Sequence, residues 1–316
     1  MLRRVWLVVT LLSGVGAAAF PQAAAPVLNE AAPSSLNADT PTIEVQSRLV
    51  AVSAIVRDKD GKPVTGLKQE DFALKQDGKT QPIKFFSQGA DVPLTLALMV
   101  DTSGSQRAYI RDEVNAGKAF FPALLKRPDD RAMLVQFDDR VLQLAKLTTT
   151  ETTLEHALAY LTEDHSDIGR AGGGGTLLFD AIVAVSHLDL GAQLGRRAMV
   201  ILTDGGDNGS HFKQKDAVRE AQRAGIMVYT IYYSNGGGSE RGLQEISSAT
   251  GGREFAVDGK MTLADIYASI ADDMRQSYEI GYVPPDARPD RYHTIELRTT
   301  EKGLSVQARE GYYTPK

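Results

Sequence analysis

Apolar residues follow two different periods along the chain. Between positions 92 and 276, near-continuous apolar runs alternate with stretches in which apolar residues recur every three or four positions. Continuous runs are typical of strands covered on both faces, and the second spacing is typical of helices. Strands that alternate with helices predict a doubly wound, mostly parallel α/β sheet. The expected strands are 94–100, 132–137, 198–202 and 226–233, and the expected helices lie around 110–124, 178–185, 217–224 and 263–274.

The segments on both sides of this α/β region alternate apolar and polar residues. The alternation is clearest at 50–56 and returns at 278–282. A period of two predicts antiparallel strands with one face in water. Each segment supplies only two to four strands, which is marginal for an independent sheet. We therefore expect the β-rich segments 42–91 and 277–316 to pair into one β-sandwich, with the α/β domain at 92–276 inserted between them.

One pair of strands in the α/β region is expected to run antiparallel. In the sequence FDDRVLQL, only Asp138 to Arg140 separate two strand-like runs. A connection this short can only join neighbouring antiparallel strands, because a parallel pair needs a long crossover. The second of these strands should therefore lie at an edge of the sheet.

The N-terminus has the order of charges and apolar residues that is typical of a secretory signal peptide. A short basic stretch, residues 1–4, precedes an apolar run that ends in three alanines at 17–19. We interpret 1–19 as a signal peptide, with an uncleaved anchor as the alternative, and expect no membrane span in the mature chain. Residues 20–41 are rich in Ala and Pro and predict a flexible linker.

Composition limits the compartment and the partners. The chain has 316 residues, of which 42% are hydrophobic, and it contains no cysteine, so neither a disulfide nor a lipid-modified cysteine is possible. Export without cysteines favours a bacterial periplasmic, cell-surface or secreted protein. The net charge is −5, and removal of residues 1–19, whose only charges are Arg3 and Arg4, lowers it to −7. That balance argues against nucleic acid as a partner.

Oxygen-bearing side chains follow the expected strands where the strands end. In LALMVDTSGSQR, an apolar run stops at Asp101, and Ser103 and Ser105 follow at alternate positions. Thr176 stands where a glycine-rich loop enters a helix, and Asp204 follows another apolar run. Ligands of doubly wound sheets bind beyond the carboxyl ends of the strands, so these five side chains should converge there.

Two carboxylates and three hydroxyls suit a hard divalent cation. Mg²⁺, or Mn²⁺ in its place, prefers oxygen ligands in near-octahedral geometry and keeps positions for water or an outside oxygen. The alternative is structural: Asp101 or Ser103 could cap the next helix, and Asp204 could belong to an ordinary turn. The three segments together favour the metal site, since each lies at the strand end or helix start that the fold requires.

At these residues the chain resembles a von Willebrand factor type A domain with a metal-ion-dependent adhesion site. DTSGS matches that family's D-x-S-x-S motif, Thr176 its threonine loop, and TDGGD its Thr-Asp-Gly signature; TGGREF resembles its late strand entry. The resemblance implies that Ser103 and Ser105 ligate the metal directly, and that Asp101, Thr176 and Asp204 ligate it directly or through water. The flanking sequences VTGLKQEDFALKQDGK and AREGYYTP resemble the bacterial VWFA-related family described from acidobacteria.

The resemblance implies a binding function rather than catalysis. In that family a partner's carboxylate completes the metal's coordination. A metal-dependent hydrolase would need a general base near the metal, and Asp207 is the only spare acid close by in the sequence. We therefore predict a non-enzymatic, exported adhesion-type module that captures an Asp or Glu side chain of a protein or peptide. The alternatives are a metal-dependent hydrolase and a purely structural envelope scaffold.

Overall fold

The computed structural model describes residues 49–314, except 90–91, 163–174, 189, 192, 194, 234–237, 258–259 and 287. The predicted signal peptide and linker, residues 1–41, lie outside the described residues, as do positions 42–48.

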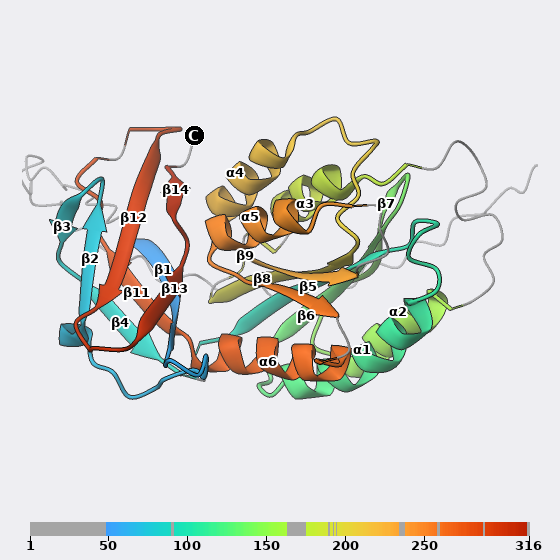
Figure 1. The fold of residues 1–316 in the computed structure, drawn as a ribbon, viewed down its shortest axis with the longest axis horizontal. Helices are drawn as coiled ribbons and strands as arrows, with labels where there is room; N and C mark the ends of the chain where they lie inside the picture. Colours follow the sequence, from blue (N-terminus) through green and yellow to red (C-terminus); the bar gives the residue numbers. More distant parts are fainter. Residues whose placement is uncertain are drawn as a thin grey trace, which may run out of the picture. The chain divides into compact units, whose positions relative to one another are not determined.

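A six-stranded sheet with the order β10-β9-β8-β5-β6-β7 forms the centre of the α/β domain (Figure 1). Neighbouring strands are parallel except β6 and β7, which pair antiparallel, with β7 at the edge. This confirms the predicted fold class and the predicted hairpin. The strands are β5 (Leu94–Asp101), β6 (Arg131–Phe137), β7 (Val141–Thr148), β8 (Arg196–Thr203), β9 (Met227–Tyr233) and β10 (Glu254–Val257).

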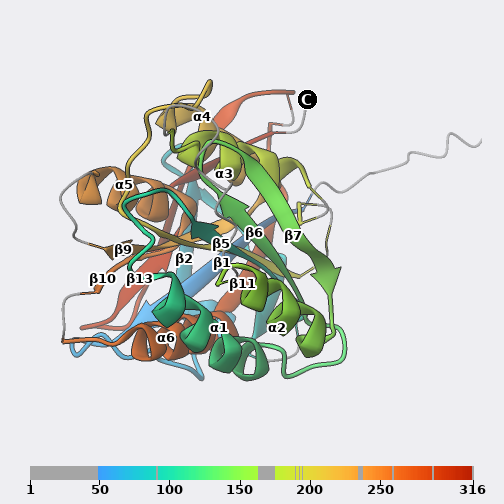
Figure 2. The same ribbon diagram turned by 90° about the vertical axis from the view of Figure 1, so that its right-hand side faces the viewer.

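Helices cover both faces of this sheet. Those on one face are α1 (Ile110–Leu124), α2 (Glu151–Tyr160) and α6 (Leu263–Gln276); those on the other are α3 (Leu178–His187), α4 (Gln214–Ala224) and α5 (Glu240–Thr250) (Figure 2). The apolar pattern did not indicate α2 and α5, because each of these helices buries only a narrow stripe of side chains. The residues before α2 are mostly threonines, which favour strands. No described helix is long and apolar enough to cross a membrane.

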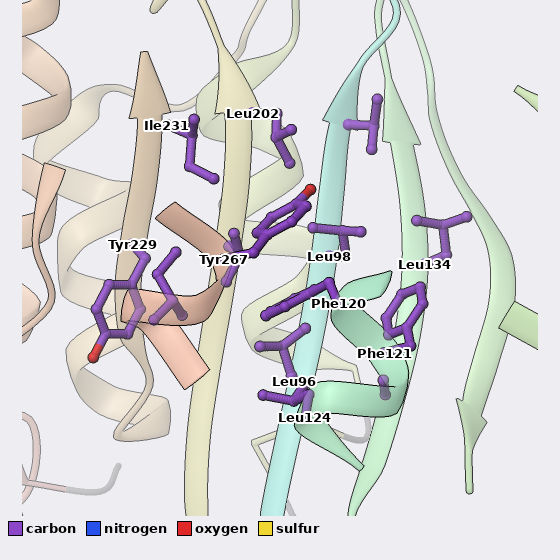
Figure 3. Packing of buried hydrophobic residues seen from close by; sticks show 14 of the residues in the cluster. Leu96, Leu98, Phe120, Phe121, Leu124, Leu134, Leu202, Tyr229, Ile231 and Tyr267 are labelled. Atoms are coloured by element: carbon purple, nitrogen blue, oxygen red, sulfur yellow. The ribbon is translucent and has the colours of Figure 1, made fainter. Parts of the chain in front are cut away.

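Strand β5 is the central element of the hydrophobic core. All of its residues are buried, and alternate side chains point to opposite faces of the sheet. Leu96 and Leu98 belong to the cluster that includes Phe120 of α1 and Tyr267 of α6 (Figure 3). The Phe120 and Tyr267 rings stack with centroids 4.2 Å apart, which ties α1 to α6. Full burial of each such leucine stabilises the fold by about 1.5–3 kcal/mol, so the strand that carries Asp101 is held firmly.

The flanking segments form two four-stranded sheets, β13-β1-β11-β4 and β14-β12-β2-β3, which pack into a sandwich. Each sheet contains strands from both flanks: β1 pairs antiparallel with β11, and β2 pairs antiparallel with β12. This confirms the predicted sandwich. The N-terminal elements are β1 (Val50–Arg57), the 3₁₀ helix η1 (Gln69–Asp71), β2 (Phe72–Gln76), β3 (Lys79–Gln81) and β4 (Phe85–Gln88). The C-terminal strands are β11 (Tyr278–Tyr282), β12 (Tyr292–Thr299), β13 (Ser305–Ala308) and β14 (Gly311–Tyr313).

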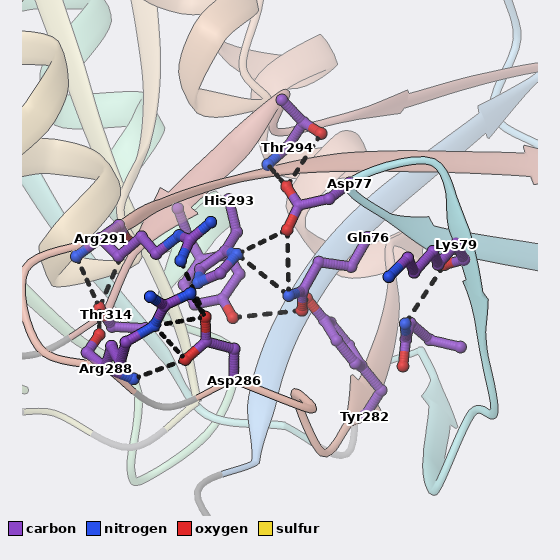
Figure 4. A network of polar contacts seen from close by, with 12 residues as sticks. Gln76, Asp77, Lys79, Tyr282, Asp286, Arg288, Arg291, His293, Thr294 and Thr314 are labelled. Carbon is purple, nitrogen blue, oxygen red and sulfur yellow. Dashed lines mark hydrogen bonds and ion pairs between the residues drawn. The ribbon is translucent and has the colours of Figure 1, made fainter.

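A polar network joins the turn between β2 and β3 to strand β12 (Figure 4). The carboxylate of Asp77 accepts hydrogen bonds from Nδ1 of the buried His293, at 2.7 Å, and from the backbone N–H of Thr294, at 3.0 Å. Asp77 has a positive φ of 49°, which Asp tolerates because its short side chain bonds locally. The network therefore fixes the register of strands that come from opposite ends of the chain.

Charged side chains connect the sandwich to the α/β domain. Helix α6 is followed by one residue, Ser277, and then by β11. Arg57 of β1 forms an ion pair with Asp273 of α6 at 2.5 Å, and both residues are buried. The guanidinium of Arg196, on β8, donates hydrogen bonds to the carbonyls of Gly89 and Ser277. These contacts hold the end of α6 in place against the sandwich.

We predict that Asp273→Ala lowers the free energy of unfolding by about 3–5 kcal/mol, because it leaves the Arg57 guanidinium buried without its partner. Arg298→Ala serves as the control, since it breaks the exposed pair with Glu296 and should change stability by less than about 1 kcal/mol. Denaturant titration followed by circular dichroism measures both values. Equal effects of the two substitutions would contradict a structural role for the buried pair.

Candidate metal centre

The five predicted ligand residues all lie at the carboxyl edge of the central sheet. Asp101 is the last residue of β5, and Ser103 and Ser105 lie in the turn that leads to α1. Asp204 follows β8, which is the parallel neighbour of β5, so the two carboxylates come from adjacent strand ends. Thr176 precedes α3, where the next N–H, that of Leu177, donates to the carbonyl of Asp138 beyond the end of β6.

Hydrogen bonds to Asp101 shape the turn after β5. Its carboxylate is fully buried, with Oδ1 accepting from the backbone N–H of Ser103 at 2.9 Å and Oδ2 accepting from the hydroxyl of Thr203 at 2.6 Å. The bond to the N–H two residues later is an Asx turn, which bends the chain sharply after the strand. As a result the hydroxyls of Ser103 and Ser105 lie 3.2 Å apart, within hydrogen-bonding distance.

The conformation of the loop after β8 is fixed by local hydrogen bonds and by a glycine with a positive φ. Asp204 is 4% exposed, and its Oδ1 accepts from the N–H of Gly206 at 2.9 Å. Gly205 has a φ of +76°, and a Cβ there would lie 3.0 Å from backbone atoms of Ser239, so only glycine fits without strain. The Gly205 N–H donates to the Thr203 hydroxyl, the group that itself donates to Asp101. Thr203 therefore connects the two strand ends.

Thr176 is held beside this loop by two hydrogen bonds to Asn208. Its N–H donates to the Asn208 side chain at 2.7 Å, and the Asn208 N–H donates to the Thr176 carbonyl at 3.3 Å. Asp207 accepts from the N–H of Phe179 and from the hydroxyl of Ser210. Asp207 thus orders the loop and the start of α3.

Electrostatics at this edge fit a divalent cation. Burial raises the pKa of Asp101 to about 6, against hydrogen bonds from Ser103 and Thr203 that lower it, and the charge of Asp204 adds to the increase. Neither carboxylate forms an ion pair with a described residue. Buried carboxylates are normally paired with a positive charge or coordinate a metal ion, and carboxylate and hydroxyl oxygens are ligands that hard cations prefer.

The hydroxyls are needed to complete such a site. Among the described residues there is no group of three or more His, Cys, Asp or Glu that could hold a metal. A site at this edge therefore depends on Ser103, Ser105 and Thr176 in addition to the two carboxylates. A neutral hydroxyl provides an oxygen without adding negative charge.

The sequence did not indicate the roles of three neighbouring residues. Thr203 was noted only as part of the Thr-Asp-Gly signature, and Asn208, a single amide in a loop, carries no signal in one sequence. Both orient the predicted ligands. Glu113 of α1 is 1% exposed, and burial together with the charge of Asp101 raises its pKa to about 8. Near neutral pH Glu113 therefore retains its proton and adds little negative charge beneath the site. The position of Glu113 next to Val114, on the apolar side of the expected helix, was the sequence feature that could have indicated its burial.

Known proteins are similar to this chain in sequence or in fold. The family model described as the von Willebrand factor type A domain matches residues 95–269. No curated protein matches the chain. A von Willebrand factor type A structure from Catenulispora acidiphila is similar at 11% identity and a TM-score of 0.50, with 86% of this chain and 76% of that chain covered. At this identity the similarity shows the fold alone.

Two further proteins have structures similar to part of this chain. Proximal thread matrix protein 1 from the mussel byssus is 17% identical with a TM-score of 0.48; 60% of this chain is covered, and this chain spans only 49% of that protein. Another structure of the mussel protein is described as having a zinc-occupied MIDAS motif. BatB from Bacteroides thetaiotaomicron is 16% identical with a TM-score of 0.46, covering 56% of this chain and 97% of that one.

We predict that Asp101→Asn stabilises the metal-free protein, and more at pH 7.5 than at pH 5. The folded-state pKa of Asp101 is raised from 3.8 to about 6, so the folded protein keeps a proton that the unfolded chain releases between these values. Stability therefore falls as the pH rises to about 6, by roughly 3 kcal/mol in all, and the neutral amide avoids this loss.

Urea titration in EDTA at the two pH values measures this effect. The pH dependence separates the charge from the shape of the side chain, since asparagine has nearly the same shape at both values. A difference between variant and wild type that does not change with pH would contradict the account of the buried carboxylate.

Proposed function

Because the chain belongs to the von Willebrand factor type A family, we propose that it is an exported, metal-dependent module that binds a protein or peptide. Domains of this family are commonly metal-dependent protein-interaction modules and are typically non-enzymatic. The observation that carries the proposal is the pair of buried carboxylates, Asp101 and Asp204, which lie with three hydroxyl side chains at the carboxyl edge of the sheet and form no ion pair with a described residue.

The proposed metal is a divalent ion, Mg²⁺ or Mn²⁺, held by Asp101, Ser103, Ser105, Thr176 and Asp204. A bound ion would supply a positively charged coordination position that is open to an oxygen from outside the chain. The residues around it act by orientation: the Asx turn of Asp101 brings the two serine hydroxyls together, and Asn208 holds the Thr176 loop. Rigid strand ends keep these side chains in position before a partner arrives.

The proposed partner group is the carboxylate of an Asp or Glu side chain. Only two of the five proposed ligands are charged, so they neutralise the ion less than a site built from three or four carboxylates would. Two carboxylates balance the formal +2 charge of the ion without making the site negative, so the open position can still accept an anionic oxygen. The geometry offers little support for hydrolysis, because Asp207, the candidate base, already accepts two hydrogen bonds that order its loop.

Export is a separate part of the proposal and rests on the signal-peptide pattern of residues 1–19. The proposed location is the periplasm, the cell surface or the medium of a bacterial cell. The absence of cysteine is compatible with an oxidising compartment, since the fold has no thiol to protect there.

Ser103→Ala and Asp204→Ala should each lower Mn²⁺ affinity by at least about tenfold, because each removes one oxygen ligand while leaving the core intact. Thr102→Ala is the matched control from the same turn: its hydroxyl donates to Asp138 at 3.1 Å instead of pointing to the site. Isothermal titration calorimetry with Mn²⁺ measures all three. The ligand assignment fails if Thr102→Ala weakens binding as much as Ser103→Ala does.

Binding of the partner should require the metal. We expect a partner isolated from envelope extract in Mg²⁺ to lose affinity in EDTA, and to lose it similarly when its contacting Asp or Glu is changed to the amide. Because linkage is reciprocal, the partner should tighten Mg²⁺ binding by the same factor. Equal affinities in EDTA and in Mg²⁺ would contradict the proposed function.

A further inference from the structure

A groove separate from the candidate metal site lies where helices α4 and α5 face strands β12 and β14 of the sandwich. Its cavity measures about 730 Å³, which is within the range of small-molecule binding sites. None of the five proposed metal ligands lines it. We call it the junction groove and define it by six of its lining residues: Gln214, Gln222, Gln244, Ser248, Tyr292 and Tyr313.

Two tyrosines form an aromatic wall of the junction groove. Tyr292 and Tyr313 are directly opposite each other in the register of β12 and β14, with ring centroids 4.9 Å apart. Tyr292 is 39% exposed, which is unusual for a large aromatic side chain on a strand. Gly311 leaves the space that the Tyr292 hydroxyl occupies, since a Cβ there would collide with that oxygen. The packing of the Tyr292 hydroxyl against Gly311 therefore fixes the position of the exposed ring.

Amide side chains line the opposite wall. Gln222 is buried and donates to the carbonyl of Ala249 at 2.8 Å, which fixes the orientation of its amide. Gln214 donates to the Glu245 carboxylate at 2.9 Å, and Gln244 lies exposed on the next helix. Each amide offers donors and an acceptor together, which is the pattern that complements a hydroxyl group.

Charge in the groove does not favour a polyanion. Its charged lining residues are Lys215, Glu245 and Glu310, so one positive charge faces two negative ones. Phosphate-rich ligands require clustered Lys and Arg, which the lining of the junction groove does not provide. Aromatic surface combined with oriented amides and little net charge fits a neutral ligand that has many hydroxyls and an apolar ring face.

The junction groove shares lining residues with two further cavities. A cavity of about 350 Å³ shares Gln244, Ser248 and Glu310 with it, and another of about 440 Å³ shares Gln222 and Tyr313. The second is also lined by Arg197, Arg223 and Arg309, so only the first continues the weakly charged surface. With the groove it offers room for an extended chain of units rather than a single small molecule.

We propose that the junction groove binds a neutral oligosaccharide, with a sugar ring packed on Tyr292 and its hydroxyls hydrogen-bonded to the glutamine amides. This site acts independently of the metal centre, and the inference does not depend on the proposed function. An extended peptide is the competing occupant, and the experiment distinguishes the two.

Saturation-transfer-difference NMR on the full chain tests the proposal, with maltotetraose, cellotetraose, mannotetraose and tetra-N-acetylchitotetraose as the probes. At least one should show transfer from the protein, in EDTA as well as in Mg²⁺. Tyr292→Ala should weaken its binding by about tenfold, the effect of losing one aromatic packing contact. Gln244→Ala, on an exposed helix surface where folding is not at risk, should weaken it by about threefold, as expected for one neutral hydrogen bond.

Phe85→Ala is the matched control, since Phe85 is a similarly exposed aromatic residue, 44% against 39%, on β4 outside the groove. It should leave binding unchanged. The proposal is overturned if none of the four oligosaccharides shows transfer, if Tyr292→Ala and Gln244→Ala bind as wild type does, or if EDTA abolishes binding. Competition by an unstructured peptide with no sugar binding would assign the groove to the peptide instead.

Discussion

The burial of Asp101 and Asp204 side by side, without an ion pair to any side chain that the structure describes, is the constraint on which the rest of the structure depends. Ionisation of the buried Asp101 carboxyl beside Asp204 destabilises the metal-free fold, so the strands that carry the two residues must be held by strong packing. Strand β5 meets that requirement, because every one of its residues is buried between helices on both faces of the sheet. The packing of β5 thus stabilises the sheet edge that carries the buried carboxylates.

The helices connect this edge to the sandwich through contacts that can be followed residue by residue. Helix α1 begins soon after Ser105, and its Phe120 ring stacks on Tyr267 of α6. Helix α6 ends against the sandwich, where Asp273 pairs with Arg57, and continues into the central strand β11. Buried contacts thus link α1 to α6, and α6 to the sandwich. The sandwich is therefore mechanically connected to the α/β domain and is not a loosely tethered neighbour.

Several features were predictable because each depends on residues close together in the sequence. The continuous apolar runs predicted strands covered on both faces, and the three-residue spacer in FDDRVLQL predicted the antiparallel edge strand; the structure confirms both. The pattern at Asp101, Ser103 and Ser105 indicated a shared site because their spacing is local. The domain limits and the ligand roles remain predictions.

Other features depend on contacts between distant positions and left no local signal. Arg57 and Asp273 are 216 positions apart, and nothing in either neighbourhood indicates the other. The same holds for the junction groove, whose walls come from helices of the α/β domain and from strands at the end of the chain. Tertiary packing, not local preference, creates these sites.

The central claim is that the carboxyl edge of β5 and β8 holds one divalent ion. The most direct measurement is anomalous X-ray diffraction from crystals of the protein grown with Mn²⁺. The account predicts a single strong anomalous peak among the oxygens of Asp101, Ser103, Ser105, Thr176 and Asp204, with direct ligand distances of roughly 2.1–2.2 Å. An empty edge, with manganese bound elsewhere on the molecule or nowhere, would contradict it.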